Sequence, residues 1–238
     1  MLKININFLS KFKPYHLVII FALLSGPAHA QQFYCTEVSL IEITAPNDSM
    51  VEDVCIASGK AISFLSKYSF LPKRAIKFQI ITTSINSHGY SAYGSYDRQN
   101  DAILLMSLPS IKKSSQSPEM YGQPFDIEHY HGAIAHEIAH AIFHHNTSNT
   151  KEQLTNAAQE YIAHSTQLSV LSDKRRQGII KAMDVGPWES GDSISVTYMS
   201  LNPTAFAVKS YLHLTQLQDP QAFVKILLNN NWFFISVP

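Results

Sequence analysis

Short stretches in the first half of the chain alternate hydrophobic and polar residues, a two-residue period that is typical of β-strands. The strands predicted from this pattern are Phe33–Thr44, Ile76–Thr83, His88–Asp97 and Asp101–Met106. The last two form a predicted hairpin that turns at Arg98–Asn100. After Pro46–Asp48 the apolar residues instead recur at every third or fourth position, which predicts a helix towards Tyr68. Residues 107–125 contain five serines and three prolines, and this composition predicts a surface loop.

The second half of the chain follows the helical period of three to four residues. The predicted helices cover about 126–145, about 150–171, Asp173–Met183, about 202–217 and Gln221–Leu228. Asp126 can cap the first of them, and Thr150 with Gln153 forms a capping box for the second. Asn202 followed by Pro203 is a typical start for the fourth. Because strands come early and helices late, the chain predicts an α+β fold with an N-terminal mixed or antiparallel sheet and a C-terminal helical lobe.

The first thirty residues have the pattern of an export signal. Their basic start carries three lysines, Lys3, Lys11 and Lys13. An apolar run at Leu17–Leu24 and a small-residue cleavage site at Ala28–Ala30 follow, and the run is far shorter than the roughly 20 residues that span a bilayer. We therefore expect a signal peptide over 1–30, cleaved after Ala30, and a single periplasmic or secreted domain over 31–238 without a membrane span. An uncleaved N-terminal anchor is the alternative.

Composition adds limits on partners and on redox state. Of the 238 residues, 45% are hydrophobic and 15% are charged, which argues against disorder. The full chain has 18 basic and 18 acidic residues, and this balance argues against nucleic-acid binding. Loss of the three signal-peptide lysines would leave 15 basic against 18 acidic residues, a charge of −3. In an oxidising compartment the only two cysteines favour a Cys35–Cys55 disulfide that would contribute roughly 3 kcal/mol, with two buried free thiols as the alternative.

The segment His136-Glu137-Ile138-Ala139-His140 is an HExxH motif inside the first predicted helix of the second half. Positions four apart lie on one helix face about 6 Å apart, so the two imidazoles can bind one metal ion. Glu137 points about 100° away, and it can instead act as a general base toward a water on that metal. The flanking residues are mostly apolar, so the helix should be buried, and buried histidines need polar partners. Two hydrogen-bonded core histidines are the alternative reading.

Catalytic zinc usually has three protein ligands and one open position, so the motif needs one further ligand. A histidine six residues after His140 would supply the metzincin arrangement, but position 146 is Asn. Glu160 follows His140 by 20 residues and lies on the next predicted helix. Small neighbours at Ala157, Ala158 and Ala163 would let that helix pack closely. The predicted zinc ligands are therefore His136, His140 and Glu160, with a solvated surface role for Glu160 as the alternative.

These residues resemble the HExxH-plus-glutamate pattern of the gluzincin metallopeptidases, the thermolysin-like and aminopeptidase-like zincins, over residues 126–165. The resemblance implies a zincin-like fold, one zinc ion per chain and hydrolysis of a peptide or protein substrate. It also implies that an edge strand before the active-site helix aligns the substrate by strand pairing, with Asp101–Met106 or His88–Asp97 as the candidates.

Two positions depart from the family pattern. His164 stands where thermolysin-like enzymes have an aspartate that orients the first histidine, and a neutral imidazole would support that ligand less. Asn202 stands where aminopeptidase-like members have the tyrosine that stabilises the oxyanion. Tyr198 is the nearest substitute, and Tyr211 and His213 are further candidates.

The sequence thus leads to the hypothesis of an exported zinc metallopeptidase. In it Glu137 is the general base and Tyr198 the oxyanion-stabilising residue. The alternatives are a catalytically inactive zincin-fold module that binds metal or another protein, and a periplasmic protein that stores or transports metal.

Overall fold

The computed structural model describes residues 30–87, 90–114, 118–147, 156–229 and 234–237, and it has a mixed α+β architecture. Its strands are β1 Gln31–Tyr34, β2 Ile41–Ala45, β3 Ile76–Ile81, β4 Ile85–Ser87, β5 Tyr90–Ala92, β6 Gly94–Asp97, β7 Ala102–Met106, β8 Glu119–Met120, β9 Gln123–Pro124, β10 Ser193–Ser195 and β11 Phe234–Ser236. Its helices are α1 Val51–Ser66, α2 Leu108–Ser114, α3 Ile127–Asn146, α4 Asn156–Ser169, α5 Asp173–Met183, α6 Val196–Leu201, α7 Pro203–Gln216 and α8 Pro220–Leu228, with a 3-10 turn at Asp48–Met50 before α1.

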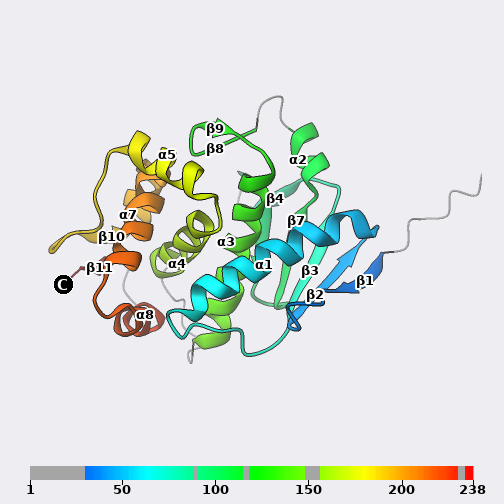
Figure 1. Ribbon diagram of the computed structural model, residues 1–238, viewed down its shortest axis with the longest axis horizontal. Helices are drawn as coiled ribbons and strands as arrows, with labels where there is room; N and C mark the ends of the chain where they lie inside the picture. Colours follow the sequence, from blue (N-terminus) through cyan, green and yellow to red (C-terminus); the bar gives the residue numbers. More distant parts are fainter. Residues whose placement is uncertain (1–29, 88–89, 115–117, 148–155, 230–233, 238) are drawn as a thin grey trace, which may run out of the picture.

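A five-stranded mixed sheet, in the order β1-β2-β3-β7-β6, forms one side of the molecule (Figure 1). The three central strands are parallel, whereas the edge strands β1 and β6 run antiparallel to their neighbours. The side chains of one face are buried: Ile41, Ile43, Ala45, Ile76, Phe78, Ile80, Ile103 and Leu105. Lys77 and Gln79 on the other face are exposed. Two helices cover the buried face, since α1 contacts β2 and α3 contacts β6 and β7.

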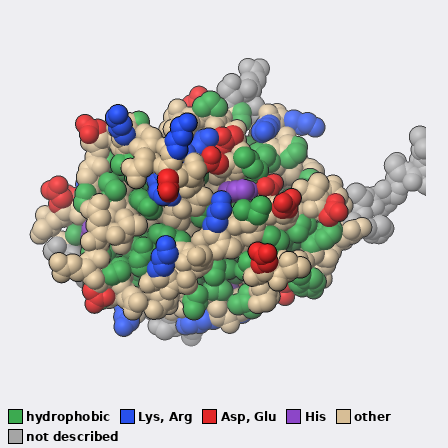
Figure 2. Space-filling model, viewed as in Figure 1, with side chains coloured by type: hydrophobic (Ala, Val, Ile, Leu, Met, Phe, Trp, Pro, Cys, Tyr) green, Lys and Arg blue, Asp and Glu red, His purple; other side chains and the backbone are tan. Residues whose placement is uncertain are grey.

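The helices α4 to α8 and the small β10–β11 sheet form a second lobe, and α3 lies between this lobe and the sheet (Figure 1). Helix α4 packs against both α3 and α7. Among the described residues, no helix combines the length and hydrophobicity that a membrane crossing requires. On the face drawn in Figure 2, acidic and basic side chains are interspersed among hydrophobic ones.

Several predicted helix boundaries are confirmed by their caps. The Asp126 carboxylate accepts hydrogen bonds from the amides of Glu128 and His129, at 3.0 and 3.2 Å, and opens α3. Asn202 accepts from the amide of Ala205 and opens α7, and α5 has the predicted bounds. The capping box at Thr150 and Gln153 lies outside the described residues, as does the predicted signal peptide apart from Ala30.

The predicted strand Phe33–Thr44 is wrong as a single element, because the chain turns between Cys35 and Leu40 and β1 pairs back on β2. The predicted disulfide is confirmed, since Cys35 and Cys55 are bonded and join the end of β1 to α1. This link fixes the turn that separates the two strands.

The predicted loop over 107–125 is also wrong in part, because it contains α2 and the short β8–β9 pair. Ile111 is fully buried, so one apolar side chain anchors α2 despite the serines around it. The predicted hairpin is confirmed for β6 and β7, which pair antiparallel. Its turn is held by Asp97, whose carboxylate accepts from the amides of Gln99 and Asn100.

Candidate metal centre

The HExxH motif faces α4 across a close helix–helix contact. Gly132 allows this approach, because a Cβ at that position would lie 3.3 Å from Cγ of Gln167 on α4. The small residues predicted to permit close packing, Ala157, Ala158 and Ala163, are all fully buried. The contact therefore brings side chains of α3 and α4 into one polar cluster inside otherwise apolar surroundings.

The three predicted zinc ligands come together in this cluster. Nε2 of His136 lies 3.1 Å from Nε2 of His140 and 3.4 Å from Oε2 of Glu160. Nε2 of His140 lies 3.6 Å from Oε1 of Glu160. Two ligands bound about 2.1 Å from one tetrahedral zinc ion are about 3.4 Å apart, so these separations fit a shared ion. The donor set of two imidazoles and one carboxylate also suits zinc.

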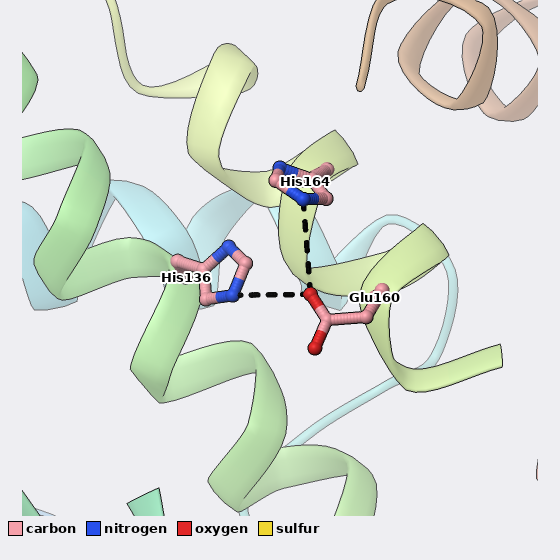
Figure 3. Close-up of side chains that lie close together, drawn as sticks. All are labelled: His136, Glu160 and His164. Atoms are coloured by element: carbon pink, nitrogen blue, oxygen red, sulfur yellow. Dashed lines mark ion pairs between the residues drawn. The ribbon is translucent and has the colours of Figure 1, made fainter. Parts of the chain in front are cut away.

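His164 is a fourth donor that the sequence reading did not assign to the metal. Its Nε2 lies 3.7 Å from Oε2 of Glu160, and the donor atoms of His136, Glu160 and His164 all lie within 4.8 Å of one another (Figure 3). The signal that could have identified it is its spacing, since a residue four positions after Glu160 lies on the same face of a helix.

Gln167 is a second residue that sequence reasoning missed. Its side-chain oxygen lies 3.0 Å from Nδ1 of His136, and its amide group donates to the sulfur of Met120. In this orientation the side-chain oxygen of Gln167 accepts a hydrogen bond from Nδ1–H of His136, which leaves Nε2 of His136 free to bind a metal. Gln167 therefore orients His136, the role that an aspartate has in the thermolysin-like enzymes that the motif resembles.

Burial and mutual charge set the protonation of the cluster. Burial lowers the pKa of His140, and burial together with the charge of His136 lowers the pKa of His164 to about 3. Burial also acts to lower the pKa of His136, but the neighbouring Glu160 carboxylate outweighs it and raises that pKa to about 9. The imidazoles hold the pKa of Glu160 well below its usual range against the opposing effect of burial. The charges of His136 and Glu160 thus favour each other, and burial disfavours the charged form of the other two imidazoles.

Glu137 lies against the edge strand β6. Its side chain is largely buried, and Oε2 accepts a hydrogen bond of 2.8 Å from the backbone amide of Tyr96. A Cβ at Gly94 would lie only 2.8 Å from Cγ of Glu137, so the strand can approach the glutamate this closely only with glycine there. The predicted general base is therefore held in place by β6.

The two candidate substrate-aligning strands differ in their position in the sheet. The strand β7 is internal, between β3 and β6, whereas β6 is at the edge. The backbone oxygen of Tyr93 accepts a hydrogen bond from the amide of Met106 on the β7 side. Because backbone groups alternate along an antiparallel strand, those of Ser95 also face β7, whereas the backbone N–H and C=O groups of Gly94 and Tyr96 face away from the sheet. The predicted strand His88–Asp97 is wrong as a single element, because its part Tyr90–Ala92 is β5 and pairs with β4 instead. Of the two candidates, β6 therefore supplies the edge.

The predicted oxyanion residue Tyr198 lies on α6, outside the cluster. Its ring packs edge-on against Trp188 with the centroids 5.0 Å apart. Trp188 in turn contacts Phe206, whose ring contacts His164. In the described part of the chain, no hydrogen bond joins Tyr198 to the four donors. Its oxyanion role stays a prediction.

The two further oxyanion candidates also have partners away from the cluster. The ring of Tyr211 stacks on Phe64, and Nδ1 of His213 lies 2.7 Å from the hydroxyl of Tyr161.

A second polar cluster lies one helical turn beyond the HExxH motif. Oδ1 of Asp101 accepts from the hydroxyl of Tyr96 at 2.6 Å and lies 3.2 Å from Nε2 of His145, while Arg74 bonds the other oxygen. The same Tyr96 hydroxyl lies 2.5 Å from Nδ1 of His144. Burial would raise the pKa of Asp101, but these donors hold it well below its usual range. The cluster fastens the β6–β7 turn to the end of α3.

Over residues 41–237 the chain matches a family described as a family of unknown function (DUF6639), and it belongs to that family. No curated protein and no solved structure matches the chain.

Proposed function

We propose that this protein is an exported, zinc-dependent metallopeptidase of gluzincin type with a zincin-like fold. His136, His140 and Glu160 would hold one zinc ion per chain, and Glu137 would be the general base. The observation that carries the proposal is the convergence of these four side chains. Three of them have the mutual separations of ligands on one ion, and the fourth, Glu137, follows His136 on α3 and lies against an edge strand.

Zinc, when bound, would supply Lewis-acid polarisation of the scissile carbonyl and would acidify a water. The side chains of the protein would orient the ligands and transfer the proton. Gln167 orients His136 through Nδ1, and the tight contact of α3 with α4 fixes the donors before the ion arrives. Oε2 of Glu137 is held by the amide of Tyr96, so Oε1 is the oxygen that takes a proton from the attacking water and passes it to the leaving amine.

The edge strand β6 supports a peptide substrate in particular. The outward-facing backbone groups of Gly94 lie beside Glu137, and an extended peptide could pair with them by adding a strand to the sheet. Such pairing uses main-chain groups, so it would hold the scissile bond near the general base without demanding one side-chain sequence.

Export rests on the disulfide and on the predicted signal peptide. The Cys35–Cys55 disulfide fits a secreted or periplasmic protein. Disulfides are rare in the reducing cytosol, so a bridge between the only two cysteines supports an oxidising compartment.

The competing function is a catalytically inactive module that uses the same cluster to bind metal or to support a protein interaction. The observation that favours it is His164, because a fourth protein donor would close a tetrahedral site to water. A closed site stabilises a fold without turning over a substrate.

Cleavage assays on a peptide library, read by mass spectrometry, separate the two functions. Zinc-loaded wild-type protein should cleave library peptides, and Glu137→Gln should lose cleavage while it retains zinc. Glutamine keeps an oxygen that can accept from Tyr96, so the strand contact survives in this variant. Undiminished cleavage by Glu137→Gln, or no cleavage by the zinc-loaded wild type, would refute the proposal.

A further inference from the structure

Among the described residues, His164 makes no hydrogen bond that would explain a histidine at this place in the fold, although Gln167 and Glu160 lie close enough to influence its pKa. Its ring is largely buried between the rings of His136 and Phe206, with centroid distances of 4.8 and 5.8 Å. Its Nδ1 is buried and has no hydrogen-bond partner in the part of the chain that the structure describes. Its Nε2 is 3.7 Å from Oε2 of Glu160, which is longer than a hydrogen bond. A buried polar atom without a partner destabilises the folded state, so a role only in packing would favour an apolar residue here.

His164 also does not orient the first histidine. That role requires an acceptor at Nδ1 of His136, and Gln167 already occupies this position at 3.0 Å. Nε2 of His164 points instead toward Oε2 of Glu160, the oxygen that also faces His136 (Figure 3). Two donor nitrogens therefore converge on one carboxylate oxygen, from α3 on one side and from α4 on the other.

We propose that His164 is a fourth protein ligand of the ion that the HExxH motif and Glu160 bind. The centre would then have three imidazoles and one carboxylate, a donor set for a divalent transition metal. Ligands on one zinc ion are about 3.4 Å apart, so coordination requires His164 to move closer to the other donors. This applies above all to His140, because the donors that lie within 4.8 Å of one another are those of His136, Glu160 and His164. The distance to Glu160, at 3.7 Å, is already close to this value.

This inference rests on the proposed function for the presence of the ion, and it adds a requirement to that function. With four protein ligands, a tetrahedral ion has no open position. Catalysis would therefore need a five-coordinate ion, a state that catalytic zinc can reach. The coordination number thus separates an active centre from a closed one.

X-ray absorption spectroscopy of the zinc-loaded protein tests the assignment directly, because multiple scattering counts the imidazoles on the metal. We expect three imidazoles in the wild type and two in His164→Ala and His164→Phe. Phenylalanine keeps the ring that packs against Phe206, so this variant tests the nitrogen without emptying the site. His131→Ala is the matched control, because His131 is on α3 but pairs with Asp53 away from the cluster. Two imidazoles in the wild type would overturn the assignment, even if neither His164 variant folds.

A competition titration with a chromophoric chelator gives a second readout. We expect zinc affinity to fall at least about tenfold in His164→Phe and to stay unchanged in His131→Ala. Two imidazoles together with peptide cleavage would refute the His164 ligand and leave the proposed function standing. Three imidazoles with four ligands in total and no cleavage would support the ligand and refute the peptidase. Absence of bound metal would refute both.

Discussion

Replacing Gly94 by alanine should displace Glu137 without touching any proposed metal ligand. The new methyl carbon would lie 2.8 Å from Cγ of Glu137, whereas ordinary carbon contacts begin near 3.4 Å, so about 0.6 Å of movement is required. Glu137 is only 8% exposed, and its Oε2 is held by Tyr96, so little free space is available for that movement. Either the carboxylate leaves its position or β6 separates from α3.

A misplacement approaching 1 Å in a reacting group can reduce the rate by about a hundredfold. We therefore expect kcat/KM of Gly94→Ala for a library-derived fluorogenic peptide to fall by about 10- to 100-fold, with zinc affinity unchanged. Overpacking should cost roughly 1 kcal/mol of unfolding free energy, measured by urea denaturation, after the gain from replacing a flexible glycine is subtracted.

Gly178→Ala is the matched control for this substitution. Gly178 lies in α5, and a Cβ there would have no neighbour within 4 Å, so the variant should keep full activity. Alanine in the helix should also raise the unfolding free energy by about 0.5–1 kcal/mol. If Gly94→Ala cleaves the peptide as fast as wild type at equal zinc content, the close contact between β6 and the general base does not govern the reaction.

Three further predictions concern the supports of the site. Asp101→Asn should lower the unfolding free energy by roughly 1 kcal/mol at pH 7, measured by urea denaturation. The difference from wild type should shrink below about pH 4, because the pKa of Asp101 in the folded protein is depressed and its stabilising contribution disappears as the carboxylate protonates. A difference that does not depend on pH would contradict this. Gly132→Ala should push on Gln167 and weaken zinc binding severalfold in the chelator titration, and unchanged affinity would exclude that coupling. The double variant Cys35→Ser, Cys55→Ser should lose about 2–5 kcal/mol of unfolding free energy while zinc content is retained, and equal stability would show that the bridge adds nothing.

Local signals in the sequence predicted the longer helices, whereas the short helices α2 and α6 were missed. Asp126 and Asn202 are caps whose side chains bond amides only two or three residues away, so sequence neighbours determine where α3 and α7 begin. The single strand predicted over Phe33–Thr44 failed because β-forming residues continue through a turn that a disulfide to α1 stabilises. That constraint comes from a residue 20 positions away.

Some residues of the candidate site could likewise be identified from local sequence, whereas others depend on tertiary packing. The HExxH spacing lies within one helix, so His136, Glu137 and His140 could be identified from the sequence alone. Glu160 could be identified from the sequence because it follows His140 by 20 residues, a spacing that resembles the gluzincin pattern. Gln167 and the edge position of β6 depend on how α3 packs against α4 and on the order of strands in the sheet. Such long-range arrangements leave no periodic signal in the chain.

The central claim is that α3 and α4 form a metal site, and metal content tests it most directly. Elemental analysis of the purified wild-type protein should find one zinc ion per chain. Glu160→Ala should contain none after the same purification, and Glu119→Ala, which removes an exposed glutamate on β8, should keep it. Wild-type protein without stoichiometric metal, or full zinc occupancy in Glu160→Ala, would contradict the account.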